Sequence, residues 1–365
     1  MRRSVSKHVV SRRDFLHMGL TLGGLAIATP LLQACGQAEP AAPTPPPPTA
    51  TPMVTRTPRP VKEEEMVNVA FVKTRDRTEG VKQALQLFGF NPVKGKQVLL
   101  KPNFNSADPA PASTHPETLR TLVEELWGMG AGSITVADRS GMAITAEVMQ
   151  ELGVFEMGEE LGFEVLSFDD MGKEDWVVIQ PPESHWKEGF AFARPCLEAE
   201  ALVQTCCLKP HRFGGQFTMS LKNSVGMVAE AVPGGTHNYM HELHSTPHQR
   251  LMIAEINTAY TPALVVLDGV QAFITAGPET GTLRWGEVVL AGTDRVAIDA
   301  VGLALLRHLG CGVAACRGPI FEEQQIARAV ELGLGVDVPE KIQLVTGDPD
   351  SEAYAAQIRE ILLRG

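Results

Sequence analysis

The stretch LVQTCCLKPHRFGGQFTMSLKNSVG, residues 202–226, decides how this chain is organised. The apolar run 201–207 at its start predicts a buried strand. We expect that strand to stop at the triplet 209–211, because its proline has no N–H to donate to a sheet. The glycines 214–215 then free the backbone, and residues 219–228 are expected to form a helix.

Four polar residues make this stretch a candidate site. Lys209 and His211 follow the expected strand, and Lys222 and Asn223 lie in the expected helix. Ionisable groups that follow a strand beside glycines are a common way for α/β proteins to build anion sites. The alternative is a solvated loop with two ordinary lysines, and the residue types alone do not separate the two interpretations.

The stretch resembles the signature of a family of bacterial and archaeal proteins known as domain of unknown function 362. The matching residues within it are Lys209, His211, Ser220, Leu221, Lys222, Asn223 and Gly226, while Cys207 replaces the first lysine of the family pattern. Matches elsewhere are the segments 101–103, 137–141, 267–269 and 277–281, and Asp294 with Asp299. The resemblance extends over about residues 67–335 and implies a fold and a site, but no particular reaction.

From residue 66 on, strand and helix patterns alternate with short turns. Such alternation predicts an α/β fold with a mostly parallel sheet flanked by helices, in one large domain or in two lobes. Strands are expected at 67–72, 97–100, 133–137, 163–168, 264–267, 287–290 and 342–345, with a hairpin of 177–179 and 190–192. Helices are expected at 78–87, 116–127, 145–152, 155–161, 295–309, 320–332 and from 351 on.

Polar residues follow four of the expected strands. They are Lys101 with Asn103, Asp138, Lys209 with His211, and Asp268. Because the carboxyl ends of parallel strands meet at one edge of a sheet, we expect these side chains to converge there, together with Lys222 and Asn223. No Ser-His-Asp order, Walker loop or dinucleotide fingerprint is visible in the sequence.

This set of residues suits an enzyme that acts on a small anionic substrate. The expected catalytic residues are Lys209, His211 and Asp268. His211 would move a proton, and Asp268 or Asp138 would adjust its pKa or hold a metal. The expected substrate-binding residues are Lys101, Asn103, Asp138, Lys222 and Asn223. The alternative is a tethered module that binds a ligand or a metal without turnover, such as a redox accessory protein.

A histidine-rich segment is the second candidate site. His237, His241, His244 and His248 fall at spacings of four, three and four, which would place them on one helical face, with a break at Pro247. Neutral imidazoles on one face are a natural site for a divalent transition metal, here with His237, His241 and His244 as ligands. The alternative is that these rings only pack or form hydrogen bonds. The family pattern has a histidine here, matched by His241 or His244.

The cysteines do not form a cluster motif. The five besides Cys35 are Cys196, Cys206, Cys207, Cys311 and Cys316, and the iron–sulfur run C-x-x-C-x-x-C is absent. Many proteins of the resembled family carry such a run, so an electron-transfer role for this chain alone is in doubt. Cys206 and Cys207 are expected to be buried and inert, whereas Cys311 and Cys316 could form a disulfide outside the cytoplasm.

The charge balance bears on the partners. The 365-residue chain carries a formal charge of −11, and its leader 1–34 holds five Lys or Arg and one Asp, so the remainder carries about −15. An acidic body argues against non-specific nucleic-acid binding, and no nucleic-acid partner is expected. The hydrophobic content of 44% is enough for a sizeable core.

The N-terminus has the features of an export signal. Residues 11–16, SRRDFL, resemble a twin-arginine signal, and a moderately apolar stretch follows at 18–32. Residues 32–35, LQAC, resemble a lipoprotein box. Segment 1–35 is therefore expected to direct export by the twin-arginine machinery and lipidation of Cys35. The alternative is a plain membrane anchor, for which the stretch is short and interrupted by Gly and Pro.

Residues 36–65 are expected to form a disordered linker rich in Pro, Thr and Ala. An extended polyproline conformation of its proline-rich part, residues 37–61, would span about 75 Å, at roughly 3 Å per residue. It would hold the α/β domain, 66–365, away from the outer face of the cytoplasmic membrane or within another part of the cell envelope. A role as a peptide ligand for another protein is the alternative.

Overall fold

The structure is a computed structural model, which describes residues 66–214 and 216–364. The expected signal segment 1–35 with Cys35, and the expected linker 36–65, lie outside the described residues. Within the described part, no helix is both long and apolar enough to cross a membrane.

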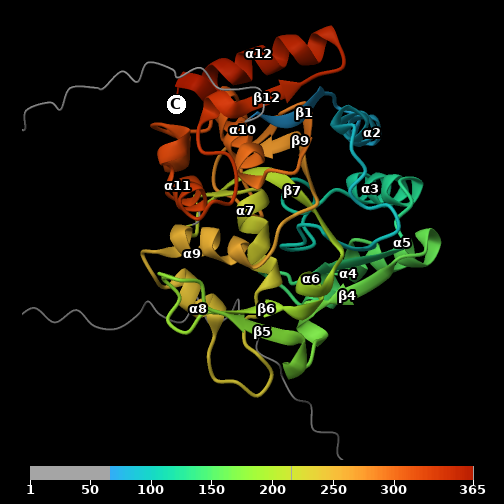
Figure 1. Cartoon of the computed structure of the whole chain (residues 1–365), viewed down its shortest axis with the longest axis vertical. Helices are drawn as coiled ribbons and strands as arrows, with labels where there is room; N and C mark the ends of the chain where they lie inside the picture. Colours follow the sequence, from blue (N-terminus) through green and yellow to red (C-terminus); the bar gives the residue numbers. More distant parts are fainter. Residues whose placement is uncertain (1–65, 215, 365) are drawn as a thin grey trace, which may run out of the picture. The chain divides into compact units, whose positions relative to one another are not determined.

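The body is built on one ten-stranded mixed sheet (Figure 1). Its order is β12 (Ile342–Val345), β1 (Val67–Lys73), β11 (Val288–Gly292), β9 (Leu264–Phe273), β7 (Ala201–His211), β2 (Gln97–Lys101), β3 (Ser133–Asp138) and β4 (Glu164–Ser167). β10 (Leu283–Trp285) pairs with β9, and β8 (Gln216–Thr218) pairs with β7. All neighbours from β9 to β4 are parallel, whereas β11 is antiparallel to both of its neighbours. The predicted mostly parallel α/β sheet is confirmed.

Helices cover both faces of this sheet (Figure 1). The longer ones are α2 (Arg77–Phe88), α3 (Pro116–Gly128), α4 (Thr145–Glu151), α5 (Val154–Leu161), α9 (Gln249–Ile256), α10 (Arg295–His308), α11 (Gln324–Glu331) and α12 (Pro349–Arg364). Neighbouring strand residues point to opposite faces, so Phe71 joins the core under α10 and α12, and Val72 joins the core under α2 and α3. Alternation along the strands therefore fills two cores from one sheet.

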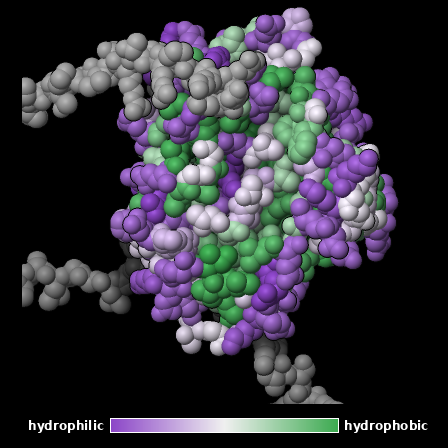
Figure 2. Space-filling model, viewed as in Figure 1, coloured by the Kyte–Doolittle hydropathy of each residue, from purple (hydrophilic) through white to green (hydrophobic). Residues whose placement is uncertain are grey.

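A third core lies beside the β2 and β3 end of the sheet. The predicted hairpin, β5 (Trp176–Ile179) with β6 (Phe190–Ala193), is present as an antiparallel pair and supplies Phe190 and Phe192 to this core. The opposite side of the hairpin contributes apolar surface, since Val178 of β5 is exposed. Figure 2 shows apolar surface in the part of the view where β5 and β6 lie in Figure 1.

Two strands differ from the sequence-based expectation. β7 does not stop before its proline but continues through Pro210 to His211. β2 pairs with β7 only as far as Gln204, and β9 pairs with β7 only as far as Leu208. At Pro210 the only described neighbouring strand is β8, so the N–H that proline lacks is tolerated there. β9 is likewise longer than expected, which places Asp268 inside the strand and not after it.

Candidate functional site

The carboxyl ends of β2 and β3 hold a buried ion pair. Lys101 Nζ lies 2.6 Å from Asp138 Oδ1 and donates to Asn223 Oδ1 at 3.1 Å. The second oxygen of Asp138 accepts the backbone N–H of Phe104 at 2.7 Å. Burial raises the pKa of Asp138, and the charge and hydrogen bond of Lys101 oppose that rise. The expected convergence of these residues at the sheet edge is thus present in the structure.

Asn223 and Gly226 bring the stretch 202–226, which resembles the family signature, into contact with this ion pair. Both lie in the short helical stretch α7 (Ser220–Asn223) and η4 (Ser224–Met227). Asn223 Nδ2 donates to the carbonyl oxygens of Thr205 at 3.2 Å and Lys101 at 3.4 Å. A Cβ added at Gly226 would lie 2.5 Å from Asp138 Oδ1 and 2.8 Å from Lys101 Nζ. Only glycine therefore lets the backbone approach the ion pair so closely.

Lys209 is completely buried and is held by neutral oxygens. Its Nζ donates to Asn103 Oδ1 at 2.9 Å and to the carbonyl oxygen of Ala112. No carboxylate among the described residues forms an ion pair with it. Burial of the ammonium group lowers the pKa of Lys209. Its placement on β7 beside Asn103 agrees with the expected cluster, but its ammonium is already engaged within the protein.

His211 ends β7 as a buried, neutral imidazole. No described residue forms a hydrogen bond with its Nδ1. Burial lowers the pKa of His211 well below its usual range, and the positive charges of Lys222, His244, Lys209 and Arg212 lower it further. A neutral ring with a vacant nitrogen is able to accept a proton or a hydrogen bond from a bound molecule.

Lys222 is the cation of the cluster that remains unengaged. It lies on α7, whose first backbone N–H groups, those of Ser220 and Leu221, donate to Asp299 at 2.7 and 2.9 Å. Within the described residues, its side chain, which is partly exposed, has no hydrogen-bond or ion-pair partner. Burial lowers the pKa of Lys222 to about 7, assisted by the charges of Lys209, Arg139 and Lys101.

Asp268 does not join His211. Its Oδ2 accepts from Arg77 Nε at 2.8 Å and from Thr118 Oγ1 at 2.7 Å, which ties β9 to α2 and α3. The charges with the largest effect on the pKa of His211 are positive. The expectation that Asp268 adjusts the pKa of His211 is therefore corrected, because a longer β9 brings this carboxylate to Arg77.

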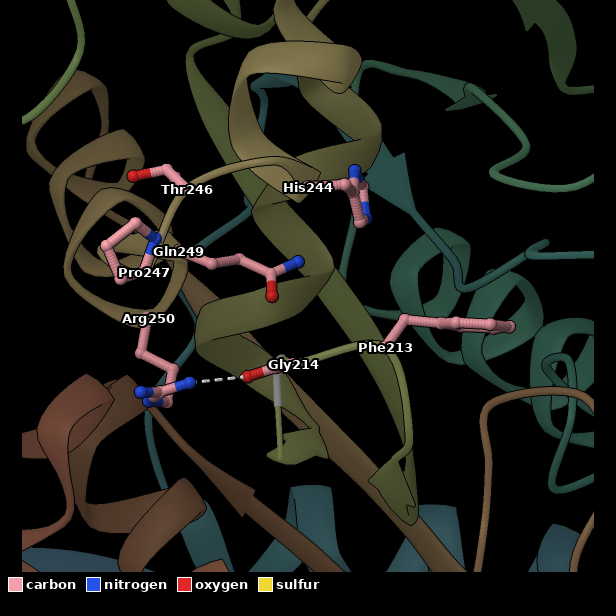
Figure 3. A pocket seen from close by; sticks show the side chains of 7 residues that line it. All are labelled: Phe213, Gly214, His244, Thr246, Pro247, Gln249 and Arg250. Atoms are coloured by element: carbon pink, nitrogen blue, oxygen red, sulfur yellow. Dashed lines mark hydrogen bonds between the residues drawn. The ribbon is translucent and has the colours of Figure 1, made fainter. Parts of the chain in front are cut away.

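A cavity of about 450 Å³ opens beside the cationic cluster. It lies between the β7–β8 turn and the region of α8 (Tyr239–His244) and α9. Its lining residues are Phe213, Gly214, His244, Thr246, Pro247, Gln249 and Arg250 (Figure 3). Gln249 is buried and points into it, and no described residue pairs with its Nε2. Burial lowers the pKa of His244, its hydrogen bond to the carbonyl oxygen of Met240 opposes this, and the charges of Lys222 and Arg139 lower it further.

Sequence reasoning did not find several of these residues. Phe213, Gln249 and Arg250 carry no motif, and their common cavity arises only when β7 and α9 come together. Arg139 lay inside a matched segment but was not assigned a role. It is buried, and its Nε donates to the carbonyl oxygen of Val228 at 2.7 Å, so it holds the chain beyond Gly226 in place.

The histidine segment is only partly helical. α8 (Tyr239–His244) contains His241 and His244, whereas His237 precedes it and lies 2.7 Å from Glu242 through its Nε2. The expected single helical face is thus corrected. His248 stands at the start of α9, as expected from Pro247. In the described part of the chain, no three His, Cys, Asp or Glu residues are grouped so that they could hold a metal.

Comparison with known proteins assigns the family. The model of the family described as "Domain of unknown function (DUF362)" matches residues 98–304, more than half of the chain, and the chain belongs to this family. Among solved structures, the lactate racemase apoprotein from Thermoanaerobacterium thermosaccharolyticum is similar, with 14% identity and a TM-score of 0.40. The similarity covers 64% of this chain and 56% of that one, so the chain spans little more than half of that protein. The comparison with curated proteins found no match.

Proposed function

We propose that this protein is an enzyme that acts on a small anionic substrate at the carboxyl ends of β2, β3 and β7. One observation carries the proposal: His211 Nδ1 is buried and has no described hydrogen-bond partner, and the charge of partly exposed Lys222 acts on this ring. Unpaired buried polar groups are costly, and they are found where a ligand or water completes the site.

The surrounding cations would attract an anion. Lys101, Lys209 and Arg139 lie close enough to depress the pKa of Lys222, and Asp138 compensates only part of this charge. A bound carboxylate or phosphate would relieve the mutual repulsion of these groups. Asn103 and Asn223 would act as positioning residues, because they hold the ammonium groups of Lys209 and Lys101.

Proton transfer is the role that we propose for His211. Its ring is neutral near pH 7, so it would accept a proton from a bound substrate and return it later in the reaction. The vacant Nδ1 supplies the required lone pair or N–H, depending on the tautomer. An anion clamp alone needs no neutral base, and this favours an enzyme over a binding module.

The test separates the enzyme from the binding module. Small carboxylates and phosphates would be screened by calorimetry, and ligands would then be followed for conversion by NMR. For the enzyme, we expect His211→Gln to bind the ligand nearly as well as the wild type while losing turnover. A wild-type protein that binds the ligand and never converts it would favour a tethered binding module.

We further propose, from residues 11–16 and the LQAC box at 32–35, that the protein is exported by the twin-arginine machinery and anchored by a lipid on Cys35. Metabolic labelling with a radioactive fatty acid tests this directly. The label should be present in the wild type and absent from Cys35→Ala, and Arg12→Lys/Arg13→Lys should leave the precursor inside the cell. Equal labelling of both proteins would contradict the lipid anchor.

A further inference from the structure

The first turn of α9 borders the cavity between the β7–β8 turn and α8. Residues 246–247 precede this helix, Gln249 and Arg250 open it, and all of them line the cavity (Figure 3). The N-cap residue, His248, makes no side-chain capping bond. Within the described residues, no hydrogen bond of normal geometry engages the backbone N–H groups of Gln249, Arg250 and Leu251. The helix therefore presents free N–H groups and the positive end of its dipole at this end of the cavity.

A buried side-chain amide points into the same cavity. Gln249 is only 3% exposed, and no described residue forms a hydrogen bond with its Nε2 (Figure 3). Gly214 allows this arrangement, since its φ is +83° and a Cβ there would fall 2.2 Å from Gln249 Oε1. An unpaired buried N–H is costly, and it is found where a ligand or water completes a site. Gln249 is thus a second donor that lacks an acceptor in the described part of the protein.

Arg250 brings a positive charge to the cavity without a carboxylate partner. Its Nη1 donates to the carbonyl oxygen of Gly214 at 2.8 Å, and its Nε donates to Gln324 Oε1 at 2.7 Å. Both acceptors are neutral. The charge of Arg250 acts on Glu323, but Oε2 of that carboxylate accepts from the backbone at the start of α11. The two neutral bonds hold the guanidinium in place and leave its charge available to an anion.

We propose that this cavity binds the phosphate group of a small organic phosphate at the start of α9. The helix N–H groups, the Gln249 amide and the Arg250 guanidinium are donors from three separate groups. A tetrahedral phosphate offers oxygens in several directions, whereas a carboxylate offers two in one plane, so a phosphate uses this set of donors better. The inference goes beyond the proposed function, because it involves no residue of the cluster at the strand ends.

The organic part of the ligand would lie against Phe213. This side chain is 48% exposed and lines the cavity across from Gln249 (Figure 3). Its ring is held by Arg212, whose guanidinium carbon lies 4.4 Å from the ring centroid, and by an edge contact with His211 at a centroid distance of 5.8 Å. A held aromatic ring offers a surface for stacking. The cavity volume of about 450 Å³ accommodates a phosphate with a small planar group.

Phenyl phosphate and benzoate are a matched pair of probes, since both carry a benzene ring and they differ in the anionic group. Isothermal titration calorimetry of the full chain measures their binding at equal ionic strength. We expect phenyl phosphate to bind on the order of ten-fold more tightly than benzoate. Arg250→Gln should weaken phenyl phosphate binding about ten- to a hundred-fold, through the loss of a charged hydrogen bond. Arg284→Gln removes the same charge at an exposed arginine outside the cavity and should leave binding unchanged.

Gln249→Leu separates ligand binding from structure. Removal of an unpaired buried amide should maintain or raise the melting temperature without ligand, while the stabilisation by phenyl phosphate should be lost. No binding of phenyl phosphate to the wild type, or equal stabilisation of the wild type and Gln249→Leu, would overturn the site. Benzoate binding as tight as that of phenyl phosphate would overturn the phosphate class. Binding that survives in Arg250→Gln and Gln249→Leu but is lost in Lys222→Gln would overturn this site and assign the anion to the strand ends, where the proposed function stands.

Discussion

Gly226 lies directly against the ion pair of Lys101 and Asp138, so the signature segment and the sheet edge form one unit. A methyl group at residue 226 would fall 2.5 Å from Asp138 Oδ1, well inside van der Waals contact. Neither side chain of the pair can move aside freely, since both are buried and Asp138 also accepts two backbone N–H groups. This close contact explains why residue 226 is a glycine, which has no side chain.

Replacing Gly226 with alanine should destabilise the protein. We expect a loss of about 1–3 kcal/mol in the free energy of unfolding, the usual cost of overpacking, together with weaker ligand binding. Urea denaturation measures the loss. Gly128→Ala is the matched control, because no atom lies within 4 Å of its added Cβ, and it should leave the midpoint nearly unchanged or raise it. Equal midpoints for the two variants would contradict the packing argument.

Breaking the Lys101–Asp138 pair should be more damaging. Asp138→Asn leaves the buried ammonium of Lys101 without its carboxylate, and such a change costs about 3–5 kcal/mol. Denaturation of the purified variant measures this cost. The exposed pair of Arg120 with Glu160 is a suitable comparison, because solvent screens this pair and Glu160→Gln should cost much less.

The contribution of Asp299 to the free energy of unfolding should fall as the pH rises from about 4 to 8. Burial raises the pKa of Asp299 to about 8, whereas an unfolded Asp has a pKa of about 4, so in this window the folded state binds more protons. Glu323, whose pKa is raised to about 7 by burial, acts in the same direction. Asp299→Asn should make the decline shallower when unfolding is measured across this pH range. An unchanged slope would show that Asp299 is not the titrating group.

Cys311 and Cys316 should form a disulfide in an oxidising compartment. Both are buried free thiols in this structure, and each thiol shifts the pKa of the other. Protein purified from the cell envelope without reductant should lack two hydrogen masses in the peptides that contain them, while Cys196 remains a thiol. Complete alkylation of both cysteines in unreduced, unfolded protein would count against this prediction.

The sequence-based hypothesis of a metal at the histidine segment predicts stoichiometric metal that His241→Ala/His244→Ala loses. In the structure His237 bonds to Glu242, and His244 Nδ1 lies 2.7 Å from the carbonyl oxygen of Met240. A metal would have to replace or share these interactions. Elemental analysis of protein exported in a native-like host decides the matter. Equal metal content in the wild type and the double variant would contradict the hypothesis.

The sequence alone predicted most elements of the fold and the edge of the sheet where the polar residues meet. Apolar runs between turn residues marked most of the strands. These features are local, because they depend on neighbours along the chain. The convergence of Lys101, Asp138 and Lys209 followed from the parallel arrangement of their strands.

The partner of each charged side chain was decided only by the tertiary structure. Asp268 bonds to Arg77, which lies 191 residues away, and not to His211. Lys101 finds Asp138, whereas Lys222 is left free beside the same pair. Such pairings depend on which distant segments pack together and on how deeply each charge is buried, and neither quantity is encoded in local spacing. For this reason the sequence predicted which residues gather at this edge of the sheet, and the fold decided the partner of each of them.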